Sequence, residues 1–156
     1  TLDIGMRLTS LLRSDGYKVV ATRDKDVDVP LWKRVEIANS HGANVFVSVH
    51  ADDNPSYPQT RGSNVYIKEG ADSRTYQLAD TVQRHLESGT GRPTNVLGGV
   101  VRKNFAVVMQ SRPAILVEVG FLSNQSDRER LQTSQFRQTI AESIRRGINA
   151  WVGAQY

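Results

Sequence analysis

Two residues of this chain combine a reactive side chain with a position at the end of an apolar run. Glu118 lies near the end of residues 114–119, an apolar, β-branched run bounded by a proline and a glycine. His50 directly follows a second run of this kind, residues 44–49. A buried, ionised carboxylate is costly unless it is paired, hydrogen-bonded or bound to a metal. Glu118 is therefore either a member of a structural ion pair or the acid/base of a site.

Several chemistries could use a histidine and a glutamate at such positions. The sequence has neither the G-x-S-x-G elbow of a serine hydrolase nor a glycine-rich phosphate loop. A glycosidase pair of Asp52 or Asp53 with Glu118 is conceivable, but nothing in the sequence sets their separation. A metal hydrolase needs His or carboxylate ligands and a general base. His50 as ligand and Glu118 as base fit this scheme, although the chain is then at least two ligands short.

The other two histidines carry weaker signals. His41 lies near the end of an expected helix, where an imidazole commonly faces solvent or the helix carbonyls. His85 lies at the edge of the apolar stripe of another helix. We expect both to be structural.

The elements that must position His50 and Glu118 follow from hydrophobic periodicity. Helical spacing predicts a first helix over residues 1–14, a second that begins at Pro30, and later ones over 73–86 and 135–152, with a brief helix capped by the box Ser126-x-x-Glu129. Strands are expected at residues 17–22, 44–49, 62–69, around 106–108 and at 114–119, with loops over 51–61 and 89–99. This alternation predicts a single α/β domain over 1–156, a three-layer αβα sandwich with a mostly parallel central sheet. Strand ends such as His50 and Glu118 then share one sheet edge.

Composition narrows the classes of partner. The formal net charge of +4 and a pI near 9.6 favour anionic partners, but the basic residues are scattered, so we expect no nucleic-acid binding.

The chain has no cysteine, which excludes disulfides and thiolate ligands. No apolar run approaches the roughly 20 residues of a membrane span. The chain begins at Thr1 without a signal peptide, so we expect a processed or trimmed polypeptide.

Beyond these local features, five segments resemble one enzyme family, the zinc-dependent N-acetylmuramoyl-L-alanine amidases of bacterial cell walls called amidase_3. The segments are GYKVVATRDKD at 16–26, LWKRVEIAN at 31–39, NVFVSVHAD at 44–52, GSNVYI at 62–67 and PAILVEVGFLSN at 113–124. The order and spacing of SVHA and LVEVGFLSN make the resemblance specific.

The resemblance implies a function and a site. The family cleaves the amide between N-acetylmuramic acid and the L-alanine of the peptide stem, using Zn²⁺ held by two His and one Glu. By this resemblance His50 is one zinc ligand and Glu118 the catalytic glutamate, while Arg102 is a candidate substrate contact. Arg23 and Arg34 are expected to hold their loop. The other two ligands, from a D-P-G-H-G-G motif and a Glu soon after it, precede the first helix in the family. They are not in this chain, which also lacks the family's N-terminal strand.

The chain departs from the family pattern at two positions and lacks one insertion. Asp52 stands where the family usually has Asn, and Met109 stands where a basic residue often follows two apolar ones. The 67 residues between His50 and Glu118 leave no room for the long blocking helix of some periplasmic relatives. We therefore expect a site that is not blocked in this way.

The leading hypothesis is thus a monomeric peptidoglycan amidase domain of the cell envelope, periplasmic or extracellular, with Zn²⁺ as cofactor. The alternative is a catalytically inactive amidase-like domain that binds peptidoglycan or a regulatory partner. Retention of His50 and Glu118 favours the enzyme, whereas the missing ligands favour the alternative.

Overall fold

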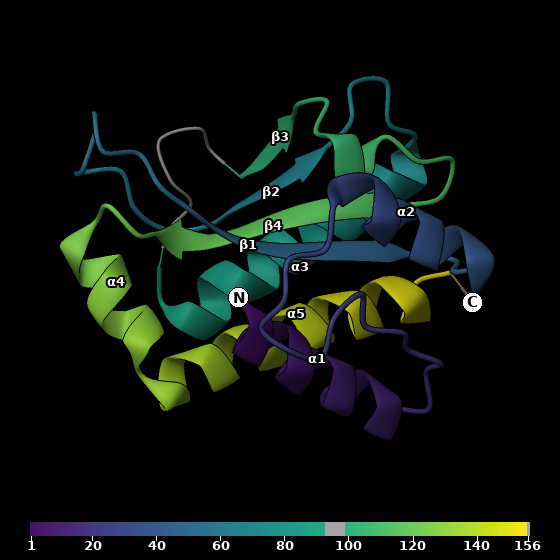
Figure 1. Ribbon diagram of the computed structural model, residues 1–156, viewed down its shortest axis with the longest axis horizontal. Coiled ribbons are helices and arrows are strands. Elements are labelled where there is room, and N and C mark those ends of the chain that lie inside the picture. The colour runs from purple at the N-terminus through teal and green to yellow at the C-terminus, as the bar shows by residue number, and fades with distance from the viewer. Residues whose placement is uncertain (93–98, 156) are drawn as a thin grey trace.

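The computed structural model describes residues 1–92 and 99–155, which form a mixed sheet covered by helices on both faces (Figure 1). The helices are α1 (Leu2–Ser14), α2 (Leu31–Ser40), α3 (Ser73–Thr90), α4 (Gln125–Gln132), α5 (Ser134–Gly153) and the 3₁₀ turn η1 (Ala106–Val108). The strands are β1 (Phe46–Asp52), β2 (Asn64–Ile67), β3 (Val100–Arg102) and β4 (Ala114–Phe121). None of the helices in the described part of the chain is long and apolar enough to cross a membrane.

The sheet has the strand order β1-β4-β2-β3. The pairs β1–β4 and β2–β3 are parallel, and β2–β4 is antiparallel. The predicted α/β fold with a mostly parallel sheet is therefore confirmed. Since β4 lies between two partners and is buried along its whole length, it is the central strand that the apolar run predicted.

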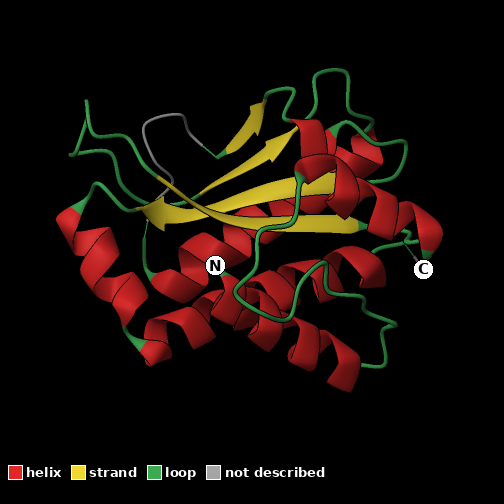
Figure 2. Ribbon diagram, in the orientation of Figure 1, coloured by secondary structure: helices red, strands yellow, loops and turns green. Residues whose placement is uncertain are grey.

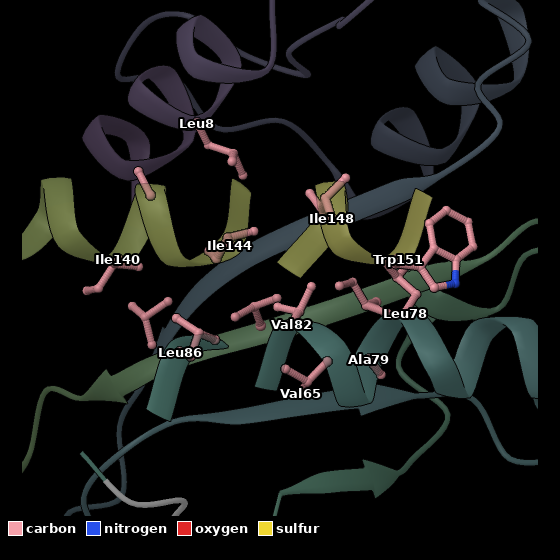
Figure 3. Close-up of a cluster of buried hydrophobic side chains, with 14 of the residues drawn as sticks. Leu8, Val65, Leu78, Ala79, Val82, Leu86, Ile140, Ile144, Ile148 and Trp151 are labelled. Carbon is pink, nitrogen blue, oxygen red and sulfur yellow. The ribbon is translucent and has the colours of Figure 1, made fainter. Parts of the chain in front are cut away.

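The two faces of the sheet have separate cores. On one face α3 and α5 pack against β2 and β4, and α1 packs on α5, around a cluster that includes Val65, Val82 and Ile144 (Figure 3). On the other face α2 and η1 cover a smaller cluster that includes Phe46, Tyr66 and Leu116. Figure 2 shows the strands between these two sets of helices. These are the three layers that the sequence predicted.

Residues 17–22 were expected to form a strand and do not. They follow α1 without any ladder to β1, although their alternation suits an extended chain. A strand needs a neighbour to satisfy its backbone groups. Residues 17–22 and β1 instead form opposite sides of a cavity of about 760 Å³. The sheet therefore ends at β1 among the described residues.

Two further local predictions were wrong. The strand expected around 106–108 is the 3₁₀ turn η1, because a tight turn buries the consecutive Val107 and Val108 in the same cluster; the strand of this region is β3. The cap of α4 is Asn124 rather than Ser126, since the Asn124 side chain accepts a hydrogen bond from the backbone N–H of Asp127. The loop expected over 89–99 begins after α3, and its residues 93–98 lie outside the described residues.

Candidate active site

His50 and Glu118 lie directly opposite each other on neighbouring strands. They are Cα partners in the parallel pair β1–β4, so both are near the carboxyl ends of their strands. Opposite residues of a strand pair project from the same face of a sheet. This face is the one that α2 and η1 cover farther along the strands, where Phe46 and Leu116 are buried. The structure thus places an imidazole beside a carboxyl group at an edge of the sheet where ligands bind in α/β proteins.

Burial shapes the chemistry of both groups. Glu118 is 6% exposed, and its Oε2 atom has no hydrogen-bond partner among the described residues. Burial, followed by the negative charge of Asp52, raises the pKa of Glu118 to about 8. Burial, followed by the positive charge of Arg34, lowers the pKa of His50, and its Nε2 atom is also buried without a hydrogen-bond partner within residues 1–92 and 99–155. A neutral imidazole can ligate a metal, and a carboxyl group with a pKa near neutrality suits proton transfer.

Asp52 brings a second carboxylate to this edge. The ladder between β1 and β4 shifts register between His50 and Asp52, so the strand end is irregular there. The backbone oxygen of Asp52 accepts a hydrogen bond from the N–H of Leu122 at 2.7 Å, and its Oδ1 accepts one from the N–H of Asp53 at 2.8 Å. These bonds hold the Asp52 carboxylate close enough to raise the pKa of Glu118.

Arg23 and Arg34 hold the loop before α2, as expected. The Nε of Arg34 donates to the backbone oxygen of Val29 at 2.8 Å, and the guanidinium of Arg23 donates to the backbone oxygen of Val27 at 2.9 Å. Arg34 also acts electrostatically on His50, since its charge is one cause of the lowered pKa. The loop therefore brings positive charge near His50.

The other candidate residues lie apart from this pair. Arg102 ends β3, two strands away from β4, and its register partner is Ile67. Its guanidinium donates to the backbone oxygen of Ala71 at 3.4 Å and lies over the ring of Tyr76. His41 and His85 each contact a carbonyl of their own helix through Nδ1. The structure thus brings His50 and Glu118 together and leaves Arg102 outside the pair.

The fit of a metal ion to this edge is partial. The orphaned Nε2 of His50 is a suitable ligand atom. Across residues 1–92 and 99–155, however, no group of three or more His, Cys, Asp or Glu side chains could hold a metal ion. His50 lies at the cavity beside β1, which Thr1 and Arg23 also line. The residues present therefore offer one ligand and an adjoining space, not a complete site.

One buried polar residue at this edge was missed by sequence reasoning. Asn64, the first residue of β2, is the register partner of Glu118 on the strand's other side. It is fully buried, and neither polar atom of its side chain has a hydrogen-bond partner in the part of the chain that the structure describes. In the sequence it lies in the strand expected over residues 62–69, and it was not singled out there as a candidate for chemistry. Its position directly before three apolar residues was the available signal.

A covered α/β sheet that carries a buried carboxyl group of raised pKa opposite an imidazole at one edge is an arrangement suited to a hydrolase domain. The chain belongs to the N-acetylmuramoyl-L-alanine amidase family Amidase_3, whose profile matches residues 1–150. A curated relative, the N-acetylmuramoyl-L-alanine amidase AmiC of Neisseria meningitidis, is 31% identical over 192 residues, 97% of this chain and 46% of its own length. The chain thus spans about half the length of that relative.

Solved structures agree in fold. The N-acetylmuramoyl-L-alanine amidase AmiC2 of Nostoc punctiforme has a TM-score of 0.89 at 34% identity, over 97% of this chain and 82% of that one. An N-acetylmuramoyl-L-alanine amidase of Clostridium difficile 630 has a TM-score of 0.91 at 27% identity, over 99% and 83% of the two chains. The sheet and its helices are therefore those of an amidase catalytic domain.

Proposed function

We propose that this chain hydrolyses the amide between N-acetylmuramic acid and the L-alanine of the stem peptide in peptidoglycan. The observation that carries the proposal is the placement of Glu118. Its buried carboxyl group has a pKa of about 8 and lies directly opposite His50, in a chain of the amidase family. Hydrolysis of an amide needs a group that removes a proton from water and supplies one to the leaving nitrogen.

Glu118 fits both halves of that proton transfer. With a pKa near neutrality, the carboxyl group changes protonation state at small cost, so one residue can serve as base and then as acid. Its exclusion from solvent strengthens its interaction with a polar substrate group. His50, held at the same level on β1, fixes the side of the sheet at which the scissile amide binds.

Zn²⁺ is the cofactor that the family resemblance implies, and His50 Nε2 is the ligand that this chain would supply. Bound there, Zn²⁺ would polarise the scissile carbonyl and acidify a water. The remaining ligands implied by the resemblance are outside these 156 residues. We place them on a strand that lies in the cavity between β1 and residues 17–22.

The walls of that cavity suit an extended chain. Apolar side chains line it from both layers, including Leu8 and Ile148 from the α1–α5 side and Ile37 from α2. The outer edge of β1, which is unpaired among the described residues, borders it along residues 46–50. A strand added at this edge would satisfy backbone groups of β1 and bury apolar side chains on both of its faces. Its end beside His50 would lie at the catalytic edge.

The substrate sets the expected location and partners. Peptidoglycan lies in the cell envelope, so we propose a periplasmic or extracellular site of action, and a monomer that needs no partner for catalysis. A positively charged protein suits the anionic polymers of a cell wall. A contact of Arg102 with substrate stays a prediction.

Digestion of purified peptidoglycan with added Zn²⁺ tests the function, in a fusion that carries the family's D-P-G-H-G-G motif and the Glu after it before Thr1, because these supply the zinc ligands that the 156 residues lack. We expect new stem peptides with a free N-terminal L-alanine, and a loss of at least about 100-fold in Glu118→Gln, since general acid–base catalysis contributes about 10²–10⁴. The control Glu36→Gln changes an exposed carboxylate that pairs with Lys33 on α2 and should keep full activity.

Metal analysis separates the enzyme from its alternative. About one zinc per molecule of this fusion, lost in His50→Ala, would support the site. Absence of cleavage and of zinc, with muropeptide binding unchanged in Glu118→Gln, would instead establish a catalytically inactive binding domain.

A further inference from the structure

Asn64 is a buried amide without a visible structural task. It has no exposed surface, and both Nδ2 and Oδ1 lack a partner among the described residues. A buried polar group that makes no hydrogen bond destabilises the folded state. Packing alone therefore does not explain why an Asn occupies the start of this otherwise apolar strand.

The register of the sheet places Asn64 beside Glu118, which gives the Asn64 side chain a neighbour that it could bind. Asn64 is opposite Glu118 in the antiparallel pair β2–β4, and His50 is opposite Glu118 in β1–β4. The three side chains therefore form one row across three adjacent strands, with Glu118 in the middle. Two residues along on the same face, the row is Tyr66, Leu116 and Ser48, where packing under α2 and η1 begins.

The unpaired atoms of this row are complementary. Glu118 Oε2 is a buried acceptor without a donor, and Asn64 Nδ2 is a buried donor without an acceptor. Directly opposite residues have Cβ atoms about 4.5–5.5 Å apart, so rotation of the two side chains brings these atoms within hydrogen-bonding reach. The alternative donor on the other side, His50, is the group that faces the cavity.

We propose that Asn64 is a positioning residue for Glu118, whose side-chain amide donates a hydrogen bond to Oε2 and leaves the other carboxyl oxygen to exchange protons with substrate. The proton-exchange half of this statement rests on the proposed function; the hydrogen bond does not. Asn64 thereby fixes the orientation of a carboxyl group that otherwise has no hydrogen-bonding restraint within the described residues.

A double-mutant cycle measured by denaturant unfolding tests the hydrogen bond without any assay of activity. The variants are Asn64→Leu, Glu118→Leu and the pair. We expect the two effects on the unfolding equilibrium constant to be non-additive by at least about fivefold. In the control cycle of Asn64→Leu with Ser143→Ala, a buried position of α5 under the opposite face, the effects should add within about twofold.

Steady-state kinetics of the fusion that carries the remaining zinc ligands then test the positioning. Asn64→Leu and Asn64→Asp should lower kcat at least about tenfold with KM within about threefold, the signature of an interaction that acts in the transition state. A merely structural role would lower the amount of folded enzyme and leave both constants of the folded fraction unchanged. If Asn64→Leu does not fold, Asn64→Ser, which is too short to reach Glu118, replaces it in both experiments.

The outcomes separate the two proposals. Additive effects of Asn64→Leu and Glu118→Leu overturn the inference, and the proposed function stands if the wild-type fusion cleaves peptidoglycan. Coupling together with a fusion that cleaves no peptidoglycan overturns the proposed function and leaves the hydrogen bond in place. Coupling with unchanged kcat refutes the positioning role alone.

Discussion

Glu118 is held in the folded protein at a cost in stability. Every residue of β4 is buried, and an ionised carboxylate in this strand has no cationic partner among the described residues. The protein reduces the cost by keeping the group protonated, which is what a pKa of about 8 means. A buried carboxyl group with a strongly raised pKa is more typical of a catalytic site than of a residue that stabilises the fold.

This cost predicts a pH dependence of stability in the metal-free chain. Since the folded pKa of Glu118 is raised from 4.5 to about 8, the native state binds more protons than the unfolded state between these values. The stability contributed by Glu118 is therefore full below about pH 4.5 and is lost as the pH rises to 8. Relative to Glu118→Gln, wild type should lose about 4 kcal/mol across this window.

Denaturant unfolding with a chelator present, from pH 4.5 to 9, measures the difference. Subtracting the Glu118→Gln curve removes the contribution of groups with lowered pKa values, such as Asp3 and Asp15, whose stabilisation is lost at lower pH. A difference between the two chains that stays constant over this range would show that Glu118 is ionised normally in the fold.

Sequence reasoning found Glu118 and His50 because a charged or polar residue within or after an apolar run violates the local pattern. Asn64 gave a weaker signal, since Asn at the start of a strand is ordinary turn chemistry. Its importance depends on register with β4, 54 residues away, which no local pattern encodes. The pKa of about 8 for Glu118 is likewise a product of packing.

At the scale of elements, Asp127 on α4 joins the ends of two strands. Its Oδ2 accepts hydrogen bonds from the N–H of Gly62 at 2.9 Å and of Phe121 at 3.1 Å, and its Oδ1 pairs with Arg92. Asp127 is 3% exposed. It thereby holds the segment before β2 and the end of β4. This helps to set the register in which Asn64 is opposite Glu118.

Asp127→Ala should therefore destabilise the domain by about 3–5 kcal/mol, the cost of breaking a buried, hydrogen-bonded ion pair. The matched control is Asp80→Ala on α3, whose pair with Arg84 is exposed and is worth at most about 1 kcal/mol. Chemical denaturation measures both. Equal, small effects at the two positions would mean that Asp127 does not hold the strands.

Gly147 sets the approach of α5 to α3. A Cβ at this position would lie 2.6 Å from the Cα of Val82, a distance that backbone atoms cannot accommodate without moving a helix. Gly147→Ala should therefore destabilise the domain by about 1–3 kcal/mol, as overpacking does. At Gly5 on α1, where nothing lies within 4 Å, the same change should stabilise by up to about 1 kcal/mol through helix propensity.

Thermal unfolding of the two glycine variants compares these effects directly. Opposite shifts in Tm are expected, downward for Gly147→Ala and upward or unchanged for Gly5→Ala. If both variants rise in Tm, α3 and α5 are not in close backbone contact at Val82.

The helices were predictable because each presents an apolar stripe with the period of a helix. The strand predictions for residues 17–22 and 106–108 were wrong. Both segments are short, and their secondary structure depends on which parts of the chain lie next to them. Residues 17–22 have the composition of a strand but no pairing partner in the described chain. Val107 and Val108 can be buried by a strand or by a turn, and only the packing under α2 decides for the turn.

At the scale of the whole molecule, the outermost strand of the sheet, β1, is also the strand that carries His50. β1 is an edge strand, His50 is its last residue opposite β4 before the register shift, and the cavity of about 760 Å³ begins there. The proposed strand would complete both the sheet and the site, since it would extend the sheet beyond β1 and bring ligands toward His50. Stability and metal binding are then expected to rise together, because a ligand-bearing strand is ordered only in the folded domain.

Hydrogen exchange measured residue by residue tests this arrangement of the sheet. In this chain, alternate amides of residues 46–50 face the cavity and should exchange at least about 100-fold faster than those of residues 114–118, whose backbone is bonded to β1 or β2. Uniform protection along β1 in this chain would show that its outer edge is already paired. A fusion that places a segment with the family's D-P-G-H-G-G motif and the Glu after it before Thr1 should protect the fast amides of β1 and leave those of β4 unchanged. Fast exchange that persists in the fusion would refute the placement of the strand in the cavity.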